Sequence, residues 1–91
     1  MGIFFWDKPH VSRREFRKVR GTLVGKGFTH HDVDKIEEIF RGDMDETNAN
    51  QEGVDAQELQ KAIKWMRENP SKHGFSTHQI DTIDGEMKKW I

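Results

Sequence analysis

Apolar residues recur along this chain with the spacing of helices that each bury one face. Four stripes have apolar positions at i, i+3 and i+7, the pattern of an amphipathic helix packed on a core. Their members are Phe16, Val19 and Leu23; Val33, Ile36, Ile39 and Phe40; Leu59, Ala62, Ile63 and Met66, with Trp65 at the edge; and Ile80, Ile83, Met87 and Trp90. The pattern predicts an all-α domain of four helices.

The four predicted helices begin with the same polar capping pattern. At each start an N-cap oxygen stands three residues ahead of a carboxylate or amide, the spacing of a capping box. The four pairs are Ser12 with Glu15, Thr29 with Asp32, Asp55 with Glu58, and Ser76 with Gln79. Helix-breaking residues predict the ends: Gly21, Gly25 and Gly27 for the first helix, Gly42 for the second, and Asn69 with Pro70 for the third. Only Val11 and Val54, each just ahead of a cap, are candidates for extended structure.

Two short sequence patterns each occur twice. The pattern of residues 11–16 recurs at 54–59, 43 positions later, and that of residues 27–29 recurs at 74–76, 47 positions later. The duplication predicts two related helical hairpins. One complete helix–loop–helix, 29–69, is then flanked by two halves of the same unit. We therefore expect an apolar N-terminal arm over 1–11 and a single four-helix domain over 12–91.

The segment between the second and third predicted helices has no full copy, and it is acidic. A helix ending at Phe40 leads into it, the β-branched Val54 follows Gly53, and Glu58 begins the next helix. This order resembles the EF-hand family, and the match is best over 27–66. The resemblance implies EF-hand-like connectivity and a non-enzymatic binding or interaction module.

The resemblance also implies a possible calcium site in this loop. Counting back from Glu58 as position 12 puts Thr47 at 1 and Ala49 at 3, which departs from the usual calcium loop. A longer loop would bind Ca²⁺ as a cofactor through oxygen atoms of Asp43, Asp45, Asn48, Asn50, Glu52 and Glu58. The alternative is that these residues solvate a turn and that Glu58 only completes a capping box with Asp55.

Charge is uneven along the chain. Residues 1–31 hold seven basic residues against two acidic, whereas 32–58 hold two against ten. Five of the basic residues crowd the first helix: Arg13, Arg14, Arg17, Lys18 and Arg20. This face could contact phosphates, so the alternative function is a small nucleic-acid-associated helical protein. The total charge of −1 and the acidic second helix favour a solvated or internally paired face instead.

Two further groups of side chains are candidates for binding. Trp65, Met66, Met87 and Trp90 could line a groove for a protein or peptide partner, or could close the core between the last two helices. Histidines near the two Gly-Phe turns could hold zinc, although capping or surface roles suit them better: His30, His31, His73 and His78.

Composition limits the remaining classes. The chain has no cysteine, so thiolate metal sites, disulfides and thiol nucleophiles are excluded. The apolar run 3–6 is too short for a membrane span, and we expect at most weak peripheral membrane contact and no transmembrane segment. No catalytic motif is present, so we expect a protein that is not an enzyme. The start of the chain lacks the basic leader of a secretion signal, so we expect a cytoplasmic location.

Overall fold

The computed structural model describes residues 10–44 and 53–91. The element order is β1 (His10–Val11), α1 (Arg13–Gly25), α2 (His30–Met44), β2 (Val54–Asp55), α3 (Ala56–Glu68), α4 (Pro70–His73) and α5 (Thr77–Lys88). The all-α class is confirmed. The described part of the chain contains five helices where the sequence predicted four, because a single turn, α4, follows Asn69.

The predicted helix starts are confirmed at all four positions. The hydroxyl or carboxylate of each N-cap residue accepts a hydrogen bond from the backbone N–H three residues later, and the side chain there accepts one in return. Each box satisfies two backbone donors that a helix start would otherwise leave unpaired. The Thr29 bonds also lower the pKa of Asp32, because they stabilise its carboxylate.

The helix ends differ in part from the prediction. Gly21 lies inside α1, which continues to Gly25, and Gly42 lies inside α2, which continues to Met44. A lone glycine costs a helix only about 1 kcal/mol, so flanking turns override it. Gly27 does end α1: its φ is 101°, and the following N–H of Phe28 donates to the Leu23 carbonyl at 3.1 Å.

The two predicted extended positions pair with each other. Val11 lies opposite Val54 in an antiparallel β1–β2 ladder, and both side chains are fully buried. The pairing joins the start of α1 to the start of α3, which are 43 residues apart in the sequence. Val11, the last residue of the predicted arm, is therefore part of the core, whereas residues 1–9 lie outside the described residues.

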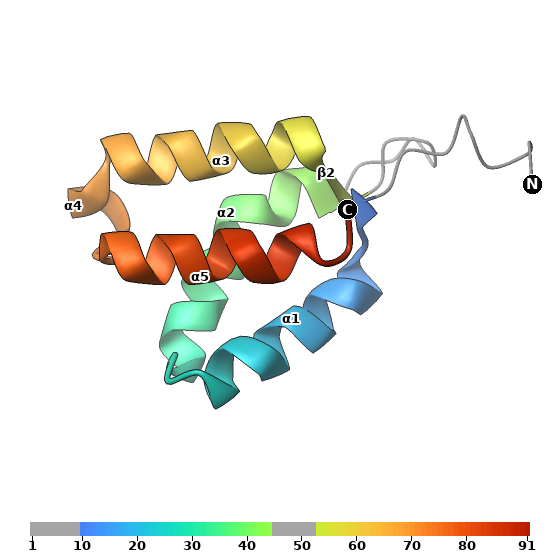
Figure 1. Ribbon diagram of the computed structural model, residues 1–91, viewed down its shortest axis with the longest axis horizontal. Helices are drawn as coiled ribbons and strands as arrows, with labels where there is room; N and C mark the ends of the chain where they lie inside the picture. Colours follow the sequence, from blue (N-terminus) through green and yellow to red (C-terminus); the bar gives the residue numbers. More distant parts are fainter. Residues whose placement is uncertain (1–9, 45–52) are drawn as a thin grey trace, which may run out of the picture.

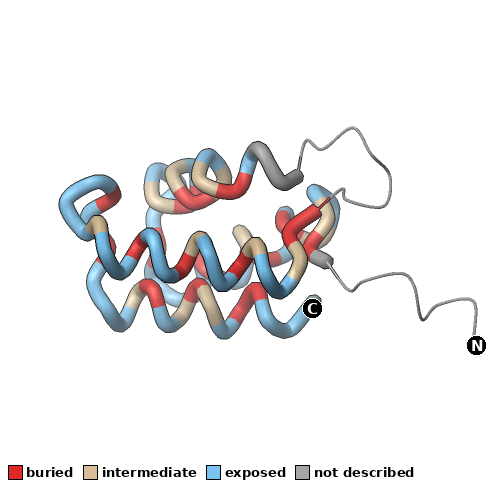
Figure 2. Tube along the Cα trace, turned by 90° about the horizontal axis from the view of Figure 1, so that it is seen from above, coloured by how far each residue is buried: buried red, intermediate tan, exposed pale blue. Residues whose placement is uncertain are grey.

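The helices surround one apolar core. Figure 1 shows α3 and α5 running antiparallel and joined at one end by α4. In the same view α2 passes behind these two helices, and α1 lies below α5. In Figure 2 the buried positions follow one side of each helix, as the stripes predict. Trp90 is an exception, because α5 ends at Lys88 and the indole is 37% exposed.

Candidate functional site

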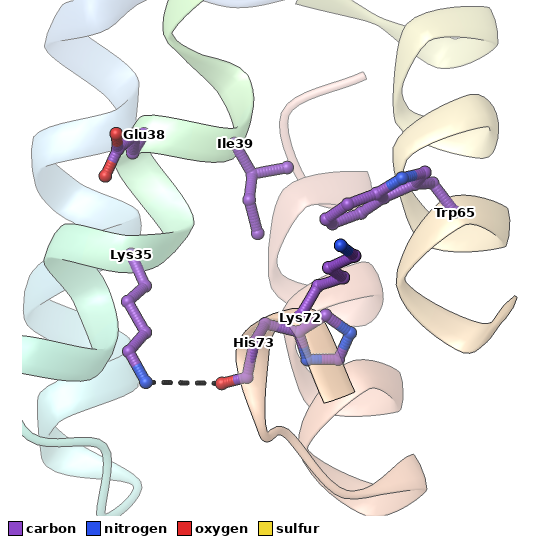
Figure 3. A pocket seen from close by; sticks show the side chains of 6 residues that line it. All are labelled: Lys35, Glu38, Ile39, Trp65, Lys72 and His73. Carbon is purple, nitrogen blue, oxygen red and sulfur yellow. Dashed lines mark hydrogen bonds between the residues drawn. The ribbon is translucent and has the colours of Figure 1, made fainter. Parts of the chain in front are cut away.

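One hollow of the described surface opens between α2, α3 and α4. It has a volume of about 300 Å³ and is lined by Lys35, Glu38, Ile39, Trp65, Lys72 and His73. In Figure 3 the Ile39 and Trp65 side chains point toward each other across the pocket, one from each long helix. The indole of Trp65 is 41% exposed, a large apolar surface left open to a ligand.

His73 forms the floor of this pocket and is 5% exposed. Its Nδ1 accepts a hydrogen bond from the Phe75 N–H at 2.9 Å, which leaves the proton on Nε2. Nε2 then donates to the Met66 carbonyl at 2.7 Å, in the last turn of α3. Because both ring nitrogens are used, His73 fixes the end of α3 and has no free lone pair for a metal.

A row of rings connects Trp65 to the core. The Trp65 and His73 ring centroids are 5.9 Å apart, and His73 stacks on Phe75 at 5.3 Å with an interplanar angle of 22°. Phe75 in turn lies 6.1 Å from Phe28. The two phenylalanines belong to the duplicated Gly-Phe turns, so both turns support the exposed indole. The apolar wall of the pocket is therefore rigidly backed.

The charged groups of the pocket are unequal in sign. The Lys35 ammonium donates to the His73 carbonyl at 3.3 Å and lies 5.9 Å from the Phe75 ring centroid. Figure 3 shows Lys72 extending beside the His73 ring toward Trp65, with Glu38 on the far side of the pocket. Neither Lys72 nor Glu38 forms an ion pair within residues 10–44 and 53–91. The two ammonium groups thus lie on different sides of His73, and the Lys72 ammonium is the one beside Trp65 (Figure 3).

The four residues predicted to line a partner groove do not form one. Met66 and Met87 are fully buried in the core, which is the alternative raised from the sequence. Trp65 and Trp90 are exposed, but Trp65 lies in the last turn of α3 and Trp90 lies just after α5. These two helix ends are at opposite ends of the antiparallel pair (Figure 1). Of the predicted set, only Trp65 lines the pocket. Its neighbours on α2 are Lys35, Glu38 and Ile39, which were not predicted as site residues. Their spacing places them on one face of a helix, which could have indicated them.

The predicted calcium ligands fall mostly outside the described side chains. This applies to Asp43, Asp45, Asn48, Asn50 and Glu52. Glu58 is described, and its Oε1 accepts a hydrogen bond from the Asp55 N–H at 3.0 Å, as a capping box requires. No group of three His, Asp or Glu side chains suited to a metal occurs among the described residues, the histidines included. The calcium site stays a prediction.

The basic face of α1 is partly occupied by internal pairing. Arg20 donates to Asp34 and to Glu37, both at 2.8 Å, and these carboxylates raise the pKa of its guanidinium, with the Asp34 hydrogen bond the largest cause. The Lys18 ammonium lies 5.4 Å from the centroid of the Trp90 ring. Arg14 and Arg17 are exposed on the same helix. The acidic second helix therefore neutralises part of the face predicted to contact phosphates.

Comparison with protein-family models, curated proteins and solved structures finds no match for this chain. Within residues 10–44 and 53–91, no helix is both long enough and apolar enough to cross a membrane.

Proposed function

We propose that this chain is a small non-enzymatic interaction module, EF-hand-like in its connections, that binds a protein segment in the pocket between α2, α3 and α4. The observation that carries the proposal is the exposed indole of Trp65 on a buried row of rings. Tryptophan is over-represented among residues that dominate binding energy, because it offers a large rigid surface and one hydrogen-bond donor.

The rigidity of this wall favours binding over a structural explanation. An indole that only filled the core would be covered, and Trp65 is not. Its neighbour His73 is fixed by two hydrogen bonds, so a ligand would meet a preformed surface and order few groups on binding. Ile39, partly buried against the core, provides the opposite apolar wall.

The EF-hand-like part of the proposal has separate support. The β1–β2 pairing links the complete unit, α2 to α3, with the half unit that begins at α1. The duplicated capping boxes at Ser12 and Asp55 stand directly after the paired residues. We infer two related hairpins, α2 with α3 and α5 with α1, and α4 is the turn that lengthens the second repeat.

A peptide selection tests the function. Random dodecapeptides displayed on phage are selected on the full chain, and the affinities of the synthesised winners are measured by calorimetry. We expect Trp65→Ala to weaken binding at least tenfold, because removing a residue that dominates binding typically costs about 2 kcal/mol or more, and about 1.4 kcal/mol already corresponds to tenfold. Trp90→Ala is the matched control, since it removes a similarly exposed indole at the other end of the molecule. Equal losses for both variants, or no selected peptide at all, would contradict the proposal.

A further inference from the structure

Resting on the proposed function, we infer that the pocket recognises an acidic protein segment, in which a large apolar side chain stands next to an aspartate or glutamate. The apolar side chain lies between Ile39 and Trp65, and the carboxylate lies beside the ammonium group of Lys72. Ile39 and Trp65 form the apolar walls of the pocket, and the Lys72 ammonium lies next to Trp65 (Figure 3).

The position of Lys72 decides the sign of the partner. The Lys35 ammonium is held at the His73 carbonyl and points away from Trp65 (Figure 3), so Lys72 is the cation beside the apolar walls. Lys72 is exposed and makes no ion pair with any described residue, and its side chain extends into the pocket beside Trp65 (Figure 3). A carboxylate placed there gains hydrogen bonds from charged donors, which are stronger than bonds between neutral groups. Such complementarity sets specificity and the association rate.

Glu38 limits how much negative charge the partner can bring. It is exposed on the α2 side of the pocket and has no ion pair within the described part of the chain. A nucleic acid carries a phosphate at every nucleotide, so a strand crossing the pocket would bring phosphates close to this carboxylate. A protein segment can instead bring a single carboxylate to Lys72. The mixed rim therefore favours a peptide over a polyanion.

The size of the pocket limits the apolar group. A volume of about 300 Å³ lies at the lower end of the roughly 300–1,000 Å³ usual for ligand pockets. It therefore accommodates a single large side chain and an adjoining polar group. Because Trp65 and Ile39 form two facing walls, a flat or branched side chain such as Phe or Leu fits between them better than a long charged one.

Matched peptides test this inference on the full chain. The probe is the fluorescein-labelled amide of Ser-Glu-Asp-Leu-Phe-Ser, and its control carries Gln and Asn in place of Glu and Asp. We expect the acidic peptide to bind at least tenfold more tightly than the neutral one at low salt, with a smaller difference at 0.5 M NaCl because salt screens exposed charges. Fluorescence anisotropy measures both affinities.

Charge reversal locates the effect. Lys72→Glu should weaken the acidic peptide at least tenfold and leave the neutral peptide unchanged. Lys64→Glu is the control, because Lys64 is also an exposed lysine of this region but lines a different surface, between α3 and α5. Equal binding of the two peptides, or equal effects of the two variants, would overturn the acidic preference. If both peptides bind equally and Trp65→Ala abolishes the binding of both, the acidic preference is wrong but the proposed function stands. If Trp65→Ala changes neither affinity, the pocket is not the binding site, and both the acidic preference and the proposed function are wrong.

Discussion

At the scale of single residues, two buried polar side chains show how this small core tolerates polarity. Among the described residues, His73 and Glu86 are the only buried ones with a polar or charged side chain. Each has partners for its polar atoms, and no described buried side-chain nitrogen or oxygen is left unpaired. His73 joins the end of α3 to the Gly-Phe turn before α5, and Glu86 joins α5 to the end of α1. Both residues therefore connect elements.

Glu86 makes stability depend on pH. Lys89 donates to its carboxylate at 2.9 and 3.1 Å and Lys26 lies at 3.4 Å, so the pKa of Glu86 falls below its ordinary value of 4.5, chiefly through the Lys89 bond. A carboxylate with a lowered pKa stabilises the fold above its unfolded pKa, and this contribution is lost as pH falls through the folded pKa. We expect Glu86→Gln to lower the free energy of unfolding at pH 7 by about 1 kcal/mol, since the ammonium groups are half exposed.

Urea unfolding at pH 7 and pH 3 measures this difference, which should shrink at the lower pH. Asp81→Asn is the control, because Asp81 pairs with Arg67 on the surface and its side chain is 59% exposed. It should change stability at pH 7 less than Glu86→Gln does. A Glu86→Gln difference that is absent at pH 7, or that persists undiminished at pH 3, would argue against this explanation.

At the scale of elements, the backbone conformation at helix ends decides which glycines matter. Gly27 ends α1 with a φ of 101°, whereas Gly85 lies within α5 and is exposed. An added methyl group would meet no atom within 4 Å at either position, so sterics with neighbours do not separate them. The conformational preference of the backbone does.

Alanine at these two glycines should act in opposite directions. We expect Gly27→Ala to destabilise by about 1 kcal/mol, because an L-residue with a side chain disfavours positive φ. Gly85→Ala should stabilise by roughly 0.5–1 kcal/mol, because alanine has the higher helix propensity. Thermal unfolding of the two variants beside the parent gives the comparison. A shift of the same sign in both would contradict the assigned conformations.

The elements were largely predictable because their signals are local. A capping box spans four residues, and an amphipathic stripe is visible within two turns, so Ser12, Thr29, Asp55 and Ser76 were identified from the sequence alone. The ends of α1 and α2 were harder, since Gly21 and Gly42 are tolerated once flanking turns are packed. The candidate pocket was harder still. It combines residues up to 38 positions apart, and no sequence period connects Lys35 with His73.

At the scale of the whole molecule, the two ends of α3 have different neighbours. The β1–β2 pair fixes the starts of α1 and α3, and the single core closes around them. At the opposite end of α3, the extra turn α4 places His73 under Trp65 and Lys72 beside it. The pocket thus lies at the α4 end of α3.

The proposal that the chain binds its partner at this pocket can be tested most directly by NMR. The isotope-labelled chain is titrated with a selected peptide, and the chemical shifts of the indole N–H and backbone amide signals are followed. We expect the largest changes in chemical shift at the Trp65 indole, Ile39 and His73, and almost none at the Trp90 indole. Shifts concentrated on the exposed basic positions of α1, such as Arg14 and Arg17, would contradict it and favour the phosphate-contacting alternative.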